Sequence, residues 1–434
     1  MSRRDREILR LAVPALGSLA IEPLVSLVDT AFVGRLGTEE LAGLGIGGAA
    51  FLWAYFGFIF LSYATTPLVA GAVGGGDLDR ARRATATAFV VGAVAGVAVW
   101  GLIELVAGPA VRLIGASGGA VDEALTYLRI RAVAAPAVMV VLAGNGAFRG
   151  YQDTRTPFVI VMAFNVVNFV LDPILIFGLN WGIAGAAWAS VAAQVVGAVA
   201  FVVVAQRRHL VSFERGAFRL HEMRSFLSAG AGLGVRTIAL LSVFTGATAV
   251  AARSGEESVA AYRVVDQVFL FLALSVDSLA VAAQALIGKH LGRSDRGEAF
   301  SVARRLFVMG LGIGLALMGL LALLRPVLPG WFTSEVVVVE AIGSIYWFLV
   351  VLQPLMAMVF VGDGVLLGWS AFRYLAVSTV ASAAAAWTVL VVVLLADLGL
   401  VGVYLGLTTL MVGRGIALRL WYRRNRALAR SVRE

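Results

Sequence analysis

Runs of about 20 apolar residues recur along the whole chain and limit what it can fold into. Each run is long enough to cross a hydrocarbon layer of roughly 30 Å as a helix that rises 1.5 Å per residue. The 434 residues are 60% hydrophobic and 14% charged, whereas a water-soluble domain carries about 25% charged residues. A membrane β-barrel would show short segments of alternating polarity instead. The sequence therefore predicts an all-α polytopic membrane protein.

About twelve such spans are present, and the charges of their connections orient them. Arginine and lysine gather in every second connection and at both termini, whereas the alternate connections hold mostly single arginines. The positive-inside rule then places both termini in the cytoplasm, which requires an even number of spans. We expect a multi-pass protein of a bacterial inner (plasma) membrane. The spans are expected near residues 11–35, 44–73, 84–107, 122–148, 157–179, 183–205, 226–252, 259–288, 302–324, 336–366, 373–396 and 400–420.

The composition excludes several classes of function. There are no cysteines, so disulfides, zinc-thiolate sites and thiol chemistry are ruled out. The net charge of +9 lies in short loops and at the termini, so nucleic acid is not an expected partner. No Gly-x-x-x-x-Gly-Lys loop occurs, which excludes ATP hydrolysis of that type. We therefore expect a protein that is not an enzyme and has no cofactor. We also expect a monomer, with the lipid bilayer and small organic molecules as partners.

An internal repeat divides the chain into two halves. A nearly constant shift along the chain aligns residues 37–42 with 255–260, and residues 144–146 with 362–364. Internal repeats are typical of secondary transporters, whose cavity lies between the repeated halves. The sequence predicts two six-helix lobes with a parallel repeat. They are an N-lobe of residues 1–205, a basic cytoplasmic linker of residues 206–225, and a C-lobe of residues 226–434 with a basic tail.

Polar residues interrupt three spans of the first half. Asp29 lies inside the first span, where an ionised carboxylate costs at least roughly 2.5–3.5 kcal/mol. Asn168 and Asp172 lie one turn apart on one face of the fifth span, and Ser190 lies in the sixth. Counted from the outer ends of the spans at 1.5 Å per residue, Asp29, Asp172 and Ser190 all lie roughly 12–13 Å deep.

The second half lacks these groups. Asp29 aligns with Ala247, and the segment around Asn168 and Asp172 aligns with residues 385–390, which offer no carboxylate or amide. The polar residues are therefore not needed by the repeated scaffold. They suit a proton-exchange site, or an oxygen-lined Na⁺ site in which Asp29, Asn168 and Asp172 are ligands. The alternative is that Asn168 and Asp172 only join helices within the bundle.

Other polar residues and prolines lie near this predicted site. Pro173 cannot donate a hydrogen bond to the carbonyl group of Phe169, which is thereby freed. Glu22 lies seven residues before Asp29 and either lines the same cavity or marks a kink at Pro23. The remaining charged or polar span residues have expected roles as follows: Asn165 as possible cavity lining, Asp266 and Asp277 as ion-pair partners of Arg263 or Arg236, Asp363 as a structural residue aligned with Asn145, and Arg129 and Arg131 as counter-ions or interface anchors.

Three segments together resemble the multidrug and toxic compound extrusion (MATE) transporters, most closely the bacterial DinF-like branch. They are Val28-Asp29-Thr30-Ala31-Phe32-Val33-Gly34-Arg35-Leu36-Gly37, Asn168-Phe169-Val170-Leu171-Asp172-Pro173 and Gly182-Ile183-Ala184-Gly185-Ala186-Ala187. The resemblance implies twelve helices in two lobes around a cleft that opens alternately to each side. It also implies a multidrug efflux antiporter, in which entry of H⁺ or Na⁺ drives export of cationic or amphipathic organic compounds.

The resemblance also assigns roles to residues. Asp29 corresponds to the coupling residue of similar proteins, and Asn168, Asp172 and Ser190 correspond to their supporting polar groups. Pro14 matches a proline at which the first helix bends, a role that we extend to Pro23. Two positions depart from the pattern of some relatives: Val25 replaces a tyrosine, and Arg236 lies where NorM-like relatives have a glutamate, which argues against a second cation site. The alternative function is a flippase for lipid-linked precursors, or a metabolite exporter, of the same superfamily.

Overall fold

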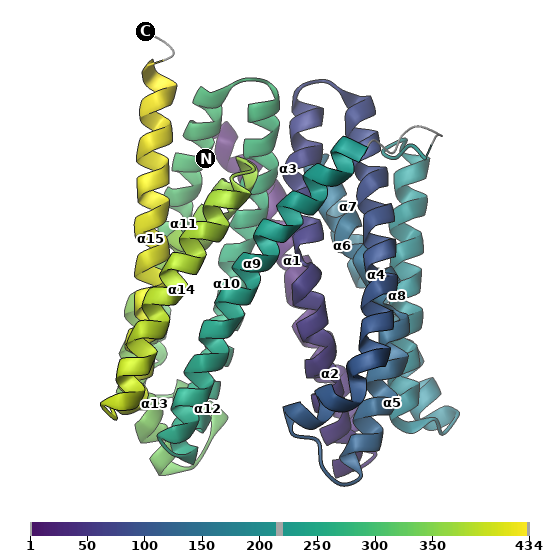
Figure 1. Cartoon of the computed structure of the whole chain (residues 1–434), viewed down its shortest axis with the longest axis vertical. Coiled ribbons are helices and arrows are strands. Elements are labelled where there is room, and N and C mark those ends of the chain that lie inside the picture. The colour runs from purple at the N-terminus through teal and green to yellow at the C-terminus, as the bar shows by residue number, and fades with distance from the viewer. Residues whose placement is uncertain (1, 214–219, 432–434) are drawn as a thin grey trace. The chain divides into compact units, whose positions relative to one another are not determined.

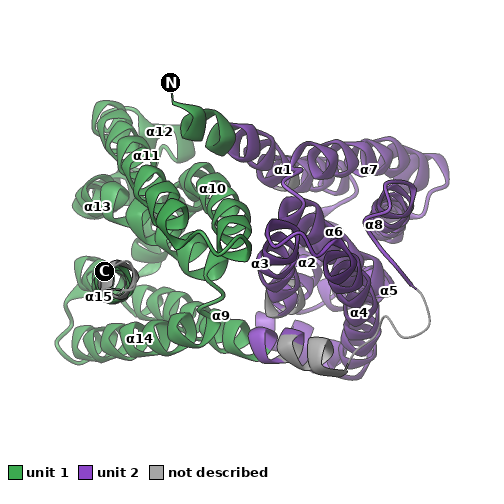
Figure 2. Cartoon of the chain, turned by 90° about the horizontal axis from the view of Figure 1, so that it is seen from above, with its two compact units in different colours: residues 1–9, 231–434 green, residues 10–230 purple. Residues whose placement is uncertain are grey.

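The computed structural model describes residues 2–213 and 220–431 (Figure 1). Within these ranges, the side chains of residues 22, 54–57, 220–225, 227 and 427–431 are not described. All regular elements in the described ranges are helices. The chain divides into two compact units, which we call the N-terminal unit (residues 10–230) and the C-terminal unit (residues 1–9 and 231–434) (Figure 2).

The first half of the chain contains eight α-helices and a π-helix. The long helices α4 and α8 are continuous. Two other segments are each divided into two shorter helices, one into α2 and α3 and the other into α5 and α6. The elements are α1 (Arg3–Val33), α2 (Thr38–Phe58), α3 (Phe60–Gly74), α4 (Leu78–Ile114), α5 (Ala120–Val133), α6 (Ala135–Gly150), α7 (Arg155–Pro173), the π-helix η1 (Ile174–Gly178) and α8 (Gly182–Arg207).

The second half consists of six long helices and one short one. They are α9 (Leu220–Arg253), α10 (Glu256–Gly292), α11 (Arg296–Leu324), α12 (Leu328–Phe332), α13 (Val336–Gly368), α14 (Phe372–Leu395) and α15 (Gly399–Ser431). Among the described residues, 10 helices are long and apolar enough to cross a membrane, and the pair α5–α6, bent by 53°, makes an eleventh span. The remaining expected span, near residues 44–73, is occupied by α2 and α3. The predicted all-α membrane fold is confirmed.

The internal repeat extends to the helix boundaries. The segment that comprises α2 and α3 runs from Thr38 to Gly74, and the shift that aligns Gly37 with Gly255 carries these bounds onto those of α10. The same shift carries the end of the pair α5–α6 onto the end of α13. The two halves differ in continuity, because α10 and α13 are unbroken whereas their first-half counterparts break at Ile59 and Ala134. The prediction of two related six-helix lobes is confirmed.

The same close helix contact recurs in both halves. A Cβ atom added to Gly96 of α4 would overlap the backbone of Pro136 in α6, and one added to Gly314 of α11 would overlap the backbone of Pro354 in α13. The shift of the internal repeat carries both residues of the first contact onto those of the second. Small residues let membrane helices approach closely and pack through van der Waals contact. A Gly–Pro contact therefore sets the spacing of equivalent helices in each half.

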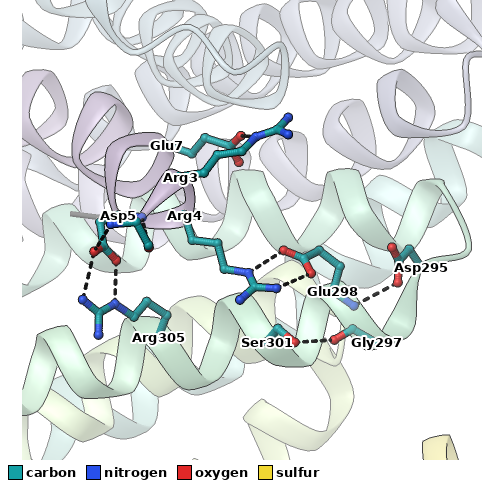
Figure 3. A network of polar contacts seen from close by, with 10 residues as sticks. Arg3, Arg4, Asp5, Glu7, Asp295, Gly297, Glu298, Ser301 and Arg305 are labelled. Carbon is teal, nitrogen blue, oxygen red and sulfur yellow. Dashed lines mark hydrogen bonds and ion pairs between the residues drawn. The ribbon is translucent and has the colours of Figure 1, made fainter.

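The first turns of α1 belong to the C-terminal unit, although the rest of this helix lies in the N-terminal unit (Figure 2). Arg4 donates from Nε and Nη2 to Glu298 of α11 at 2.7 and 2.8 Å, and Arg305 of α11 donates to both oxygens of Asp5 at 2.5 and 3.0 Å (Figure 3). Paired hydrogen bonds between arginine and carboxylate fix orientation as well as adding energy. We call these two ion pairs the N-terminal clasp.

Candidate functional site

Two carboxyl groups meet in the N-terminal unit. Asp29 of α1 and Asp172 near the end of α7 lie close enough for their carboxyl groups to interact directly. Asp172 is 0% exposed and Asp29 is half-buried. Oδ1 of each residue is buried and receives no hydrogen bond from a described donor. Two carboxylates at this separation repel each other unless a proton or a cation lies between them. We call Asp29 and Asp172 the acid pair.

The end of α7 positions Asp172 and its amide neighbour. Asn168 lies one turn earlier, is 3% exposed, and donates from Nδ2 to Asp172 Oδ2 at 3.3 Å. Because the amide nitrogen is the donor, the amide oxygen is still able to accept a hydrogen bond or bind a cation. Pro173 ends α7, and the backbone continues as the π-helix η1. Irregular turns of this kind frequently occur at functional sites.

Helices α8 and α5 complete the surroundings of the acid pair. Ser190 of α8 is 6% exposed and lies within hydrogen-bonding reach of the Tyr127 hydroxyl group of α5. Arg131, one turn after Tyr127, acts electrostatically on both carboxyl groups. Its guanidinium group lies 4.8 Å from the centroid of the Phe51 ring. Arg131 is therefore a counter-ion of the acid pair, one of the two roles expected for it.

Tyr127 is a member of the site that the sequence interpretation missed. Tyr127 is 5% exposed and interacts electrostatically with Asp29 and Asp172. Its spacing of four residues from Arg131 places both side chains on one face of α5. That spacing was the available signal, because a basic side chain inside a span usually faces a polar interior.

Aromatic contacts hold α1 against α7 beside the acid pair. The ring of Phe32 lies 6.0 Å from that of Phe169 and 6.4 Å from that of Phe177, measured between centroids. Nearer the start of α1, a Cβ atom at Gly17 would overlap the ring of Phe158 in α7. Because Phe32 follows Asp29 by three residues, the same face of α1 presents both side chains toward α7.

The remaining residues predicted for the site are not brought into it by the described contacts. Asn165 donates to the backbone oxygen of Val161 on its own helix at 2.8 Å. The Glu22 side chain lies outside the described residues, so its predicted role in lining the cavity stays a prediction. Pro14 and Pro23 both lie inside α1, which continues through them. Their role in bending stays a prediction as well.

In the C-terminal unit, the position of Asp29 is taken by Ala247, which is 0% exposed in an apolar cluster. The buried charge of this unit lies elsewhere, at Asp363, which accepts hydrogen bonds from Arg236 and Arg414. The aligned Asn145 donates to the backbone oxygen of Val141 at 3.0 Å instead. This arrangement supports a structural role for Asp363, because the carboxylate links α13 to α9 and α15.

Two other acidic residues of α10 differ in their surroundings. Asp266 makes no hydrogen bond or ion pair with any described residue, and Arg263 is the basic residue that acts on it electrostatically. The predicted pairing of Asp266 with Arg263 or Arg236 therefore stays a prediction. Asp277 acts electrostatically on Arg414.

Comparisons with known proteins agree over nearly the whole chain. The MatE family model matches residues 14–174 and 233–394, one match in each half. Protein DETOXIFICATION 44, chloroplastic, of Arabidopsis thaliana is 34% identical over 425 residues, which cover 95% of this chain and 81% of that protein. DNA damage-inducible protein F of Escherichia coli is 26% identical over 436 residues, which cover 98% and 93% of the two chains.

Solved structures share the fold. A crystal structure described as MATE in the bent conformation has a TM-score of 0.90 at 21% identity and covers 99% of this chain and 97% of that one. An outward-facing multidrug resistance MATE family transporter has a TM-score of 0.88 at 21% identity and covers 98% and 96%. The resemblance to MATE transporters stated from the sequence is thereby confirmed. The chain belongs to the MatE family, whose members are membrane transporters and not enzymes.

Proposed function

We propose that the protein is a cation-coupled antiporter that exports cationic or amphipathic organic compounds across a bacterial inner membrane. Entry of H⁺, or of Na⁺, drives the export, and both termini lie in the cytoplasm. The observation that supports this proposal most directly is the acid pair, in which two buried oxygens have no described hydrogen-bond donor. A proton shared by the carboxyl groups, or a Na⁺ ion between them, removes their mutual repulsion.

The acid pair joins two helices, which gives ion binding a mechanical consequence. Asp29 belongs to α1 and Asp172 to α7. When a proton neutralises Asp29, the repulsion between the carboxyl groups falls and α1 packs against α7, bending at Pro14 and Pro23. This movement drives the conformational change that expels the bound compound outward. When Asp29 is deprotonated, Arg131 and Asn168 stabilise the charges and the transporter accepts a new compound.

The available driving force is sufficient for efflux. Each charge that enters contributes roughly 2.3 kcal/mol per 100 mV of membrane potential, and each proton about 1.4 kcal/mol per pH unit. A tenfold concentration ratio of an uncharged compound costs about 1.4 kcal/mol. One or two protons per cycle therefore sustain a ratio of a few orders of magnitude for an uncharged compound. Export of a singly charged cation cancels the electrical contribution of one proton.

The test is export by the full chain in proteoliposomes under an imposed pH or Na⁺ gradient. We expect Asp29→Asn and Asp172→Asn to abolish uphill export. Asp122→Asn is the matched control, because this exposed carboxylate lies near the start of α5, away from the acid pair. Uphill export by Asp29→Asn at the normal rate would refute the coupling role. If a Na⁺ gradient drives export and a pH gradient does not, the coupling ion is Na⁺ and the site stands.

The alternative of a lipid-linked precursor or anionic metabolite as cargo requires a basic cavity. The buried arginines of the C-terminal unit, Arg236 and Arg414, both donate to Asp363. An anion would have to displace this carboxylate to use their charge. The described contacts therefore favour a cationic or amphipathic cargo over an anionic one.

A further inference from the structure

The C-terminal unit contains a pocket that the acid pair does not account for, with about 420 Å³ of space when the open solvent at its mouth is included. It lies between α9, α10, α13 and α15, and one carboxylate, Asp266, contributes to an otherwise apolar wall. Sites that bind small organic molecules typically combine a few polar groups with an apolar and aromatic lining. The pocket is lined by Phe244, Val265, Asp266, Phe269, Phe348, Leu349, Leu352, Met356, Tyr404, Leu407 and Met411.

Asp266 has no hydrogen-bond or ion-pair partner among the described residues. It is half-buried and forms no hydrogen bond or ion pair, and Arg263, which acts on it from a distance, is exposed. Removing a carboxylate from water without a partner is unfavourable. A cation bound in the pocket would supply the missing partner.

The aromatic rings beside Asp266 suit the same ligand. The rings of Phe244 and Phe269 lie 6.5 Å apart, and those of Phe348 and Tyr404 lie 5.9 Å apart, measured between centroids. The faces of aromatic rings attract cations, most strongly where water is excluded. Met356 and Met411 add flexible, polarisable side chains that adapt to ligands of different shape.

The first half has no equivalent of this pocket chemistry. When the shift of the internal repeat is reversed, the positions of Asp266, Phe244, Phe348 and Tyr404 fall on glycine, serine, isoleucine and alanine. These residues are Gly48, Ser26, Ile130 and Ala187, in the same order. Phe269, in contrast, falls on Phe51, so Asp266 and the other three aromatic residues of the pocket are the part found in the C-terminal unit alone.

We propose that this pocket is a binding site for hydrophobic, singly charged organic cations. The positive charge of the ligand pairs with Asp266, and its apolar body packs against Phe244, Phe269, Phe348 and Tyr404. That such a cation is also the exported compound rests on the proposed function. Its binding to the pocket does not, since the site contains no member of the acid pair.

The test is equilibrium binding of radiolabelled tetraphenylphosphonium to the purified full chain in detergent. Tetraphenylborate has nearly the same shape and the opposite charge, so the comparison isolates the effect of the sign of the ligand's charge on binding. We expect saturable binding of tetraphenylphosphonium and at least about tenfold weaker binding of tetraphenylborate, because a ligand anion would face the Asp266 carboxylate. Tetraphenylborate binding of equal affinity would overturn the assignment of a cation site.

Two pairs of variants locate the binding. Asp266→Asn should weaken tetraphenylphosphonium binding about tenfold or more, whereas Glu340→Gln, which removes an exposed charge from α13, should not change it. Phe269→Leu should weaken binding about threefold or more, whereas Phe271→Leu should have no effect, because Phe271 of the same helix is 65% exposed. Wild-type affinity in both Asp266→Asn and Phe269→Leu would overturn the proposal.

Further variants keep the two proposals separable. If Asp266→Asn does not fold, two other variants still decide the question. Asp266→Glu keeps the charge and should keep tetraphenylphosphonium binding. Phe269→Leu should weaken it. Asp29→Asn should bind tetraphenylphosphonium with the affinity of the wild type while losing coupled export. Normal coupled export by Asp29→Asn would refute the proposed coupling and leave the binding result intact.

Discussion

The Tyr127 hydroxyl group of α5 lies beside Ser190 and acts electrostatically on both carboxyl groups of the acid pair. We expect Tyr127→Phe to keep the buried ring and lose only this polar contact, worth about 0.5–1.5 kcal/mol if it forms a hydrogen bond in the transport cycle. If the contact is made during the coupled step, proton-driven export in proteoliposomes falls about two- to tenfold. An unchanged export rate would exclude Tyr127 from the coupling site.

The matched control is Tyr151→Phe in the same unit. The Tyr151 hydroxyl group donates to the backbone oxygen of Leu210 at 2.9 Å, away from the acid pair. This variant should lower the melting temperature about as much as Tyr127→Phe does, and leave the export rate per folded molecule unchanged. The comparison therefore separates an effect on coupling from an effect on stability.

The acidic members of the site could be predicted because a carboxylate in an apolar helix is costly wherever it occurs. Asp29 and Asp172 stand out in the sequence for that reason, and counting along the helices places them at equal depth. Tyr127 carries no such cost, since a tyrosine is common in membrane helices. The absence of a partner for Asp266 could not be predicted either, because ion pairs between helices depend on how the helices are rotated.

The Gly–Pro contact between α4 and α6 can be tested by substitution of its glycine. We expect Gly96→Ala to lower the melting temperature of the purified protein, because its Cβ atom would overlap the backbone of Pro136. Overpacking of this kind costs about 1–3 kcal/mol. Gly101→Ala is the control on the same helix, because nothing lies within 4 Å of a Cβ atom there. Equal stability of the two variants would show that the α4–α6 contact is loose.

Most helices could be predicted, and their interruptions only in part. The long apolar runs and the repeat locate the spans, since a helix must satisfy its own backbone hydrogen bonds in lipid. The 53° bend between α5 and α6 was not predicted, although Pro136, the second residue of α6, is consistent with it. The break between α2 and α3 at Ile59 was not predicted either, although Gly57 lies two residues before it. Pro173 was expected to free a carbonyl group, and the backbone after it forms the π-helix η1.

Helix α1 belongs to both units of the molecule, and the N-terminal clasp fixes its first turns to α11. We expect the charge reversal Arg4→Glu to lower the melting temperature and the export rate, because the new carboxylate would face Glu298 across the clasp. The clasp is partly exposed, with side chains 46% and 28% accessible, so the loss of stability should be about 1 kcal/mol. The double variant with Arg4→Glu and Glu298→Arg should recover both properties.

The control for this experiment is the neighbouring residue Arg3. Its side chain is 90% accessible and forms its ion pair along the helix, with Glu7 at 3.2 Å. Arg3→Glu should therefore change stability by no more than about 0.5 kcal/mol. If the double variant is as impaired as Arg4→Glu alone, the clasp does not act through the pairing of these two charges.

The matching Gly–Pro contacts of α4–α6 and α11–α13 also bear on the history of the chain. An identical contact at an identical offset is the mark of a duplicated gene, in which an ancestral six-helix protein was copied and joined head to tail. Each copy still packs its helices in the inherited way. Because the scaffold is present twice, the side chains of the two halves could diverge. The first half now holds the acid pair, whereas the second half holds Asp266 among aromatic rings.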